Sequence, residues 1–187
     1  MKILLHTCCG PCSIYPVQYF REHGIDVYGY FFNPNIHPYT EFTRRRDTLD
    51  QYAKEIGLNM IYDQEYPLEE FLQGVAFREV NRCRFCYSMR LERAVRVAKK
   101  GGFDFFSTTL LVSPYQKHDL IREIGEAIGE KYGVLFKYVD FRPGYREATI
   151  QSRALGMYRQ QYCGCIYSEK DRYYRDQTKR KNQNKAI

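Results

Sequence analysis

The sequence predicts an α/β protein with a doubly wound parallel sheet. Apolar stretches rich in aromatic and β-branched residues alternate with segments of helical periodicity as far as Val139. A glycine ends each helical segment just before the next expected strand, as glycines at helix C-termini commonly do. Strands that alternate with helices of this length form parallel sheets with helices on both faces.

Each expected element rests on a short stretch of sequence. The strands are runs in which aromatic and β-branched residues predominate; in chain order they are 2–6 (KILLH), 26–32 (DVYGYFF), 58–62 (LNMIY), 103–111 (FDFFSTTLL) and 134–139 (VLFKYV). The helices between them are 13–23, 40–56, 87–100 and 115–132, and the glycines that end them are Gly24, Gly57, Gly101 and Gly133. After Val139 the sequence is helix-like and irregular, which predicts a C-terminal extension of the sheet domain.

Length and charge set the broad class of the protein. The chain has 187 residues, and we expect a single domain over residues 1–187. No stretch reaches the roughly 20 apolar residues of a membrane span, and the N-terminus lacks the shape of a signal peptide. We therefore expect a cytoplasmic protein with no membrane partner. The net charge is +7, and the segment from Lys170 onward holds seven Lys and Arg residues against two Asp. A basic tail from about residue 170 indicates either a polyanionic partner, nucleic acid first, or a solvated chain end.

Seven cysteines are the most informative feature of the composition. They fall into three tight groups, which are Cys8, Cys9 and Cys12; Cys83 and Cys86; and Cys163 and Cys165. A compartment that keeps thiols reduced does not support a disulfide framework. Buried structural cysteines usually stand alone, so this clustering favours metal binding or redox chemistry.

The first cysteine group, in HTCCGPC, follows the first strand directly. Nucleotide-binding proteins of this architecture carry a glycine-rich phosphate loop there. Such a loop has several glycines, whereas this segment has only Gly10, and Pro11 lacks an N–H that could bind a phosphate. The segment therefore occupies the position of a phosphate loop, but its cysteines are typical of a metal site. Cys12 is expected either to face this site or to pack in the core. His6, at the end of the strand, is expected to be a hydrogen-bonded core residue.

Two further cysteine pairs complete the set. Cys83 and Cys86 form a CxxC at the start of helix 87–100, where the helix N-terminus should lower the pKa of both thiols. With Cys8 and Cys9 they supply four thiolates from two loops. Side chains of adjacent cysteines are expected to diverge, which favours a [4Fe–4S] cluster over a single zinc ion. Cys163-Gly164-Cys165 would form a strained disulfide, so it fits a redox-active dithiol or ligands for a second metal better than a structural bridge. Two packed thiols near a turn are the alternative.

Polar side chains after the other strands are candidate substrate contacts. Ligands bind at the carboxyl ends of the strands in open parallel sheets. The candidates are Asn33, Asn35 and His37 in NPNIHP, Ser113, Tyr115 and Gln116 in LLVSPYQ, and Asp140 and Arg142 in DFRPGY. For the two asparagines, turn formation beside proline is the alternative role. Arg44, Arg45 and Arg46 are expected either to face a phosphate or to lie on the solvated side of helix 40–56.

These motifs together resemble the cobalamin-independent epoxyqueuosine reductases of the QueH type. HTCCGPC, NPNIHP, RCRFCYSMRL, TTLLVSPYQ, DFR and QYCGC occur in the order expected for that family, over nearly the whole chain. The resemblance implies a sheet of the adenine-nucleotide α-hydrolase (HUP-like) group. It also implies reduction of epoxyqueuosine to queuosine at the wobble position of tRNA, the last step of queuosine biosynthesis in tRNA, with electrons from an unidentified donor.

The resemblance also assigns roles by position. It implies that Cys8, Cys9, Cys83 and Cys86 hold a [4Fe–4S] cluster and that Cys163 and Cys165 are a redox-active pair. An additional mononuclear iron is expected beside the cluster, with Cys12, Cys163, Cys165 or an aspartate as candidate ligands. Removal of the epoxide oxygen takes two electrons and two protons, and Asp140 or a tyrosine is the expected proton donor.

Two other classes of protein remain open. One is an ATP-dependent tRNA thiolation enzyme of the same fold group, which should carry an intact Gly/Ser-rich pyrophosphate loop after the first strand. The other is a non-enzymatic zinc or nucleic-acid-binding module, which should be colourless after anaerobic purification.

Overall fold

The computed structural model describes residues 1–174, and its centre is a parallel sheet of five strands in the order β3-β2-β1-β4-β5. The strands are β1 (Lys2–His6), β2 (Asp26–Phe31), β3 (Asn59–Tyr62), β4 (Phe105–Thr108) and β5 (Leu135–Phe136). The chain builds outward from β1 to β3, then returns to the other side of β1 with β4. This reversal of strand order confirms the predicted doubly wound fold and places its switch point between β1 and β4.

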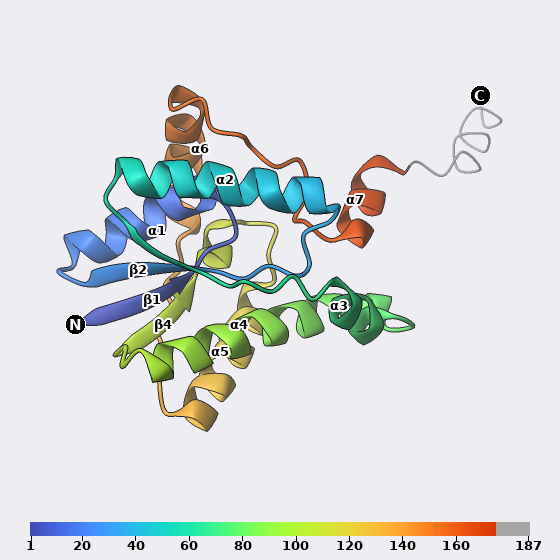
Figure 1. Cartoon of the computed structure of the whole chain (residues 1–187), viewed down its shortest axis with the longest axis horizontal. Helices are drawn as coiled ribbons and strands as arrows, with labels where there is room; N and C mark the ends of the chain where they lie inside the picture. Colours follow the sequence, from blue (N-terminus) through green and yellow to red (C-terminus); the bar gives the residue numbers. More distant parts are fainter. Residues whose placement is uncertain (175–187) are drawn as a thin grey trace.

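Helices cover both faces of the sheet. Helices α1, α2 and α6 lie on one side of it, and α4 and α5 pack against each other on the other side (Figure 1). Their bounds are α1 (Gly10–Glu22), α2 (Tyr39–Glu55), α4 (Arg82–Lys100), α5 (His118–Tyr132) and α6 (Tyr145–Ala154). Two short helices, α3 (Leu68–Val75) and α7 (Ile166–Tyr173), lie toward the end of the sheet at which β1 ends.

The core lies between the sheet and these two helix layers. Ile3, Leu4 and Leu5 of β1 have no exposed surface, since the central strand is covered on both faces. A separate apolar cluster joins α3, the start of α4 and α7, with Phe71, Val75 and Cys165 as its buried members. Apolar packing therefore fixes the C-terminal cysteine segment beside the start of α4.

The structure departs from the predicted elements at the carboxyl ends of β4 and β5. The apolar run 103–111 is a strand only over Phe105–Thr108 and continues as a 3₁₀-helix, Thr109–Val112. Thr108 causes the change locally, because its hydroxyl accepts a hydrogen bond of 3.2 Å from the Leu110 N–H. Leu110, Leu111 and Val112 are buried in either conformation, so hydrophobicity alone does not distinguish the two. The last strand is also shorter than predicted: β5 has two residues, and the segment from there to residue 139 is irregular.

Other differences concern the helices. Helix α4 begins at Arg82 rather than at 87, and α3 was not predicted. The predicted basic tail begins inside α7, whereas the part of it from Arg175 to Ile187 lies outside the described residues. Over residues 1–174, no helix combines the length and the apolar composition that crossing a membrane requires.

Candidate metal centre

The first cysteine group lies at the switch point of the sheet. Cys8 follows β1, and Thr109 follows the neighbouring strand β4. The Cys8 N–H donates to Thr109 Oγ1 at 3.1 Å, and the Thr109 hydroxyl lies 3.4 Å from Cys8 Sγ. These contacts hold Cys8 where open parallel sheets bind their ligands, as the sequence predicted.

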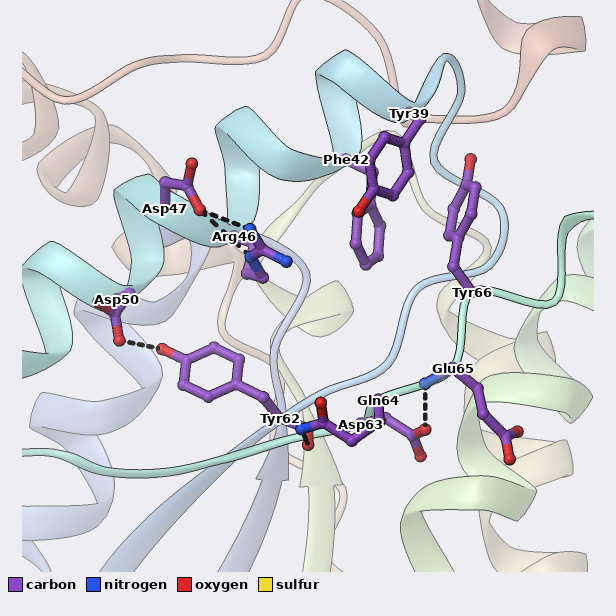
Figure 2. A pocket seen from close by; sticks show the side chains of 10 residues that line it. All are labelled: Tyr39, Phe42, Arg46, Asp47, Asp50, Tyr62, Asp63, Gln64, Glu65 and Tyr66. Carbon is purple, nitrogen blue, oxygen red and sulfur yellow. Dashed lines mark hydrogen bonds and ion pairs between the residues drawn. The ribbon is translucent and has the colours of Figure 1, made fainter.

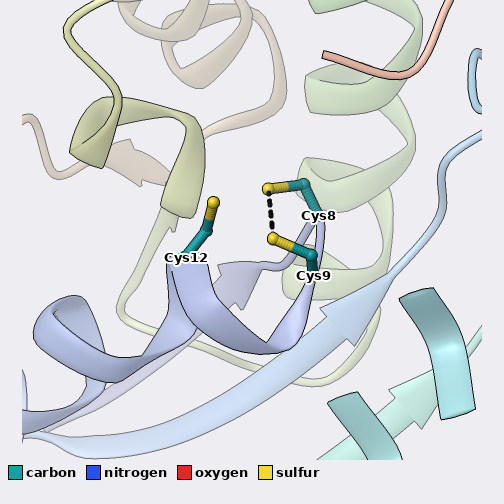
Figure 3. Close-up of side chains that lie close together, drawn as sticks. All are labelled: Cys8, Cys9 and Cys12. Carbon is teal, nitrogen blue, oxygen red and sulfur yellow. Dashed lines mark hydrogen bonds between the residues drawn. The ribbon is translucent and has the colours of Figure 1, made fainter. Parts of the chain in front are cut away.

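Three thiols converge there. Cys8, Cys9 and Cys12 stand at the start of α1, and their sulfur atoms lie within 4.8 Å of one another (Figure 3). Cys8 Sγ and Cys9 Sγ are 3.8 Å apart, so the expectation that these adjacent side chains diverge is wrong. Figure 3 shows the side chains of Cys8 and Cys9 pointing to the same side at the start of α1. A spacing of this kind suits two sulfurs on one metal ion.

Hydrogen bonds make the three thiols unequal. Hydrogen bonding with the neighbouring thiols of Cys12 and Cys9 holds the pKa of Cys8 well below its usual value. Burial raises the pKa of Cys9, and the hydrogen bond to Cys8 raises that of Cys12. Gln160, which belongs to the C-terminal extension, contacts two of these thiols: its Nε2 lies 3.1 Å from Cys9 Sγ and 3.4 Å from Cys12 Sγ.

Cys83 and Cys86 lie inside the first two turns of α4, because the helix begins at Arg82 and not at 87 as predicted. Both are half-buried and pack against the main core, which also contains Cys8 and Cys9. Burial raises the pKa of Cys86 to about 11, so the expected lowering by the helix N-terminus is wrong for this thiol. The loss of solvation outweighs the helix dipole at a buried position. The side chain of Arg90, one turn along α4, reaches Cys86 Sγ at 3.8 Å.

The third group immediately precedes α7. Cys163 is exposed, Cys165 is buried, and their sulfur atoms are 4.0 Å apart with both thiols free. A hydrogen bond from the Cys165 thiol lowers the pKa of Cys163 to about 7. Cys165 packs with Cys86 in the apolar cluster of α3, α4 and α7. The three cysteine groups thus occupy one edge of the molecule.

Sequence reasoning missed the side chains that support this edge. Arg45 is buried and donates to the carbonyl oxygens of Tyr162 at 3.1 Å and Cys163 at 3.0 Å, with Glu41 as its ion-pair partner. Both expectations for Arg45, that it faces a phosphate or that it lies in solvent, are therefore wrong. The spacing of four residues between Glu41 and Arg45 indicates an ion pair on one face of α2. The spacing does not show that this face packs against the segment that carries Cys163.

Two predicted substrate contacts are buried among protein groups. Asn33 is 1% exposed; its amide donates to Thr7 O at 2.9 Å and accepts from Arg90 Nη2 at 2.5 Å. His37 is 6% exposed, accepts a hydrogen bond from the Ile166 N–H through Nδ1, and donates its own backbone N–H to Gly164 O. Both side chains support the cysteine segments, and an indirect role fits their placement better than direct contact with a substrate.

The remaining predicted contacts are more accessible. Tyr115 is 84% exposed, Ser113 is half-buried, and Gln116 accepts a hydrogen bond of 2.7 Å from the Tyr87 hydroxyl. Asp140 and Arg142 form an exposed ion pair of 2.6 Å. The hydrogen bond from Arg142 lowers the pKa of Asp140 to about 2, so Asp140 can take up a proton for donation only where this ion pair opens.

Two hollows in the described part of the chain differ in their relation to the cysteines. One of about 70 Å³ lies beside Cys12 and Gln160. The other, of about 370 Å³, lies between α2 and the segment after β3 and contains no cysteine (Figure 2). Aromatic and charged side chains line it: Tyr39, Phe42, Arg46, Asp47, Asp50, Tyr62, Asp63, Gln64, Glu65 and Tyr66. The small hollow is the one that adjoins the candidate metal centre.

Comparison with protein families gives a match over nearly the whole chain. The family model described as "Epoxyqueuosine reductase QueH" matches residues 3–171. An epoxyqueuosine reductase QueH of Dehalococcoides mccartyi is 38% identical over 172 residues, which cover 92% of this chain and 94% of that protein. The protein of the same name from Thermotoga maritima is 39% identical over 176 residues, covering 89% of both chains.

Solved structures share the fold at low sequence identity. The U34-tRNA thiolase NcsA from Methanococcus maripaludis, solved with its [4Fe–4S] cluster, superposes with a TM-score of 0.60 at 16% identity, over 90% of this chain and 61% of the other. A predicted subunit of a tRNA methyltransferase from Methanocaldococcus jannaschii gives a TM-score of 0.54 at 10% identity, over 82% and 74%. At these identities the likeness is one of fold, and it agrees with the parallel sheet described above.

Proposed function

The chain belongs to the epoxyqueuosine reductase QueH family, and on that premise we propose that it reduces epoxyqueuosine to queuosine in tRNA, the last step of queuosine biosynthesis. The match of the family over residues 3–171 carries this proposal. The substrate is a tRNA with epoxyqueuosine at the wobble position, and the electrons come from a donor that is still to be identified. The single domain of residues 1–187 and a cytoplasmic location, where free thiols persist, are parts of the same proposal.

The donor set of the candidate metal centre fits an iron–sulfur cluster. All seven cysteines are free thiols, those of Cys8, Cys9 and Cys12 converge at the switch point of the sheet, and thiolates are the ligands that such clusters use. We propose that Cys8, Cys9, Cys83 and Cys86 hold a [4Fe–4S] cluster; to bind two different irons, the sulfur atoms of Cys8 and Cys9 would move apart from their 3.8 Å separation. Cys12 is the remaining thiol of the N-terminal group, and with Cys163 and Cys165 it is a candidate ligand for an additional iron.

The reaction removes one oxygen atom from the substrate. Both C–O bonds of the epoxide break, a carbon–carbon double bond forms, and the oxygen leaves as water after taking up two electrons and two protons. The bound metal group supplies one-electron transfer and, at an iron with an open position, a Lewis acid for the departing oxygen. The protein must therefore bind the modified base, hold it against the cysteine edge and deliver two protons.

The exposed groups at the strand ends suit these tasks. The Tyr115 ring is accessible for stacking on a nucleobase turned out of the anticodon loop. Ser113, Gln116 and Arg142 are proposed to hold polar groups of the modified base. Asp140 is the proposed proton donor, once substrate separates it from Arg142, and Cys163 with Cys165 is the proposed second store of electrons beside the cluster.

The test is an assay of the modified nucleoside. The chain is purified without oxygen and incubated with dithionite and tRNA from a strain that accumulates epoxyqueuosine, and the digested nucleosides are analysed by mass spectrometry. We expect the substrate to lose one oxygen atom, together with a brown protein that contains iron and sulfide. An ATP-dependent gain of sulfur in the tRNA would instead identify a thiolation enzyme. A colourless zinc protein that leaves the nucleoside unchanged would identify a binding module and refute the proposal.

A further inference from the structure

Helix α4 carries a buried positive charge that no carboxylate balances. Arg90 is 3% exposed and points from the third turn of α4 toward the cysteine edge. None of the ion pairs formed within residues 1–174 includes Arg90. The other buried arginine, Arg45, lies 2.7 Å from Glu41. Arg90 is thus the exception among the buried guanidinium groups described.

The groups around Arg90 show what can balance it. Nη2 donates to Asn33 Oδ1 at 2.5 Å, Nε lies 3.3 Å from His6 Nε2, and Nη1 lies 3.8 Å from Cys86 Sγ. An amide and an imidazole carry no negative charge, whereas a cysteine does as a thiolate. Asn33 is held in place by its second hydrogen bond, to Thr7 O. The contacts therefore fix the guanidinium beside the one partner that can become an anion.

A buried charge without a counter-charge is costly to the folded state. The cost disappears when the cysteines bind metal, because a cluster held by four thiolates has a net negative charge, which grows when the cluster is reduced. We propose that Arg90 is the counter-charge of the metal–thiolate group in this protein and that it favours both the loaded state and the reduced state. This inference rests on the proposed cluster ligands and assigns a role to a residue outside them.

The proposal predicts opposite effects of one substitution on two states of the protein. Arg90→Met keeps much of the side-chain length and removes the charge. The metal-free variant should melt at the same temperature as the metal-free wild-type chain or higher, because the unbalanced charge is gone. The loaded variant should release its metal to a chelator more readily, with an affinity lower by about 10- to 100-fold, as for other residues that contact metal ligands. The midpoint potential of its cluster should move to a more negative value.

Arg93 provides a matched control on the same helix. Its guanidinium lies 2.9 Å from Asp63 and 2.8 Å from Glu65, so its charge is already balanced. Arg93→Met should lower the melting temperature of the metal-free protein and leave metal retention and potential unchanged. Arg90→Lys retains a positive charge, and it should restore both metal retention and potential toward the wild-type values.

The outcomes separate this inference from the proposed function. If Arg90→Met destabilises the metal-free protein as Arg93→Met does, and the loaded protein keeps wild-type retention and potential, Arg90 is a structural residue and the inference is wrong. Should Arg90→Met fail to fold, Arg90→Lys decides: wild-type retention and potential in that variant support the inference, and values unlike the wild type overturn it. If the wild-type chain binds zinc and no iron, the proposed function fails, but the stability and chelator measurements on the zinc-loaded proteins still test Arg90.

Discussion

Arg45 Nη1 of helix α2 donates a hydrogen bond of 3.0 Å to the carbonyl oxygen of Cys163, which follows it in the chain by 118 residues. The same guanidinium donates to Tyr162 O, and the His37 N–H donates to Gly164 O on the other side of the segment. The backbone that carries Cys163 and Cys165 is therefore fixed by α2 and by the turn after β2. Its position does not depend on the C-terminal extension alone.

Replacement of Arg45 should loosen this segment and leave a buried carboxylate unpaired. Arg45→Gln is expected to lower the free energy of unfolding by about 3–5 kcal/mol, the usual effect of breaking a buried ion pair. Iodoacetamide should also modify Cys163 at a rate different from that in the wild-type chain. Arg46→Gln is the control, because its pair with Asp47 is largely solvated and contributes about 1 kcal/mol or less.

A double variant separates the charge effect from the positioning effect. Glu41→Gln combined with Arg45→Met removes both charges, so the stability should recover in part while the altered reactivity of Cys163 remains. If chemical denaturation and alkylation return to wild-type values together, Arg45 contributes to folding only.

The sequence was sufficient for the fold class because alternating strands and helices are a local pattern. It was also sufficient for the cysteine groups, since each lies within a few residues. The supporting side chains could not be predicted from the sequence for a physical reason. Arg90 contacts Asn33 at a separation of 57 residues in the chain, and Gln160 contacts Cys9 at a separation of 151. Such contacts arise only when the sheet brings α1, α4 and the C-terminal extension to one edge. The prediction that the Cys8 and Cys9 side chains diverge was wrong for a similar reason, because their directions depend on how the chain turns between β1 and α1.

Removal of single thiols should identify the cluster ligands. Alanine at Cys8, Cys9, Cys83 or Cys86 is expected to remove most of the iron and all of the activity, because each assigned ligand would be lost. Iron and sulfide analysis with anaerobic absorption spectra measures this. Cys12→Ala is the informative comparison, since Cys12 completes the N-terminal group of thiols. A Cys83→Ala protein with full iron and sulfide would contradict the assignment, and a Cys12→Ala protein without them would place Cys12 among the ligands.

Serine at Cys163 and Cys165 should stop the reaction without emptying the site. The oxygen of serine keeps the size of the thiol but not its redox chemistry, and the N-terminal and α4 thiols remain to hold the cluster. The expected result is a nearly unchanged cluster spectrum with no loss of oxygen from the nucleoside in the assay. Full turnover by the double serine variant would exclude these cysteines from electron storage and from metal binding needed for catalysis.

The pH dependence of stability should report the environment of His6. This residue has no exposed surface, its ring nitrogens lie 2.9 Å from Thr108 Oγ1 and 3.0 Å from Phe32 O, and burial lowers its pKa from 6.5 to about 3. Between these two pH values the unfolded chain binds a proton at His6 and the folded chain does not. The stability contributed by the neutral imidazole is thus complete above about pH 6.5 and is lost as the pH falls, with a slope of up to about 1.4 kcal/mol per pH unit.

His6→Gln separates this effect from the titration of carboxylates in the same pH range. The glutamine amide offers one donor and one acceptor to Phe32 O and Thr108 without a titrating proton. Urea unfolding of the metal-free proteins from about pH 8 to about pH 5 should show the wild-type chain losing stability faster than the variant below about pH 6.5. Parallel stability curves for the two proteins over this range would mean that folding leaves the proton affinity of His6 unchanged, and the neutral buried histidine would have to be abandoned.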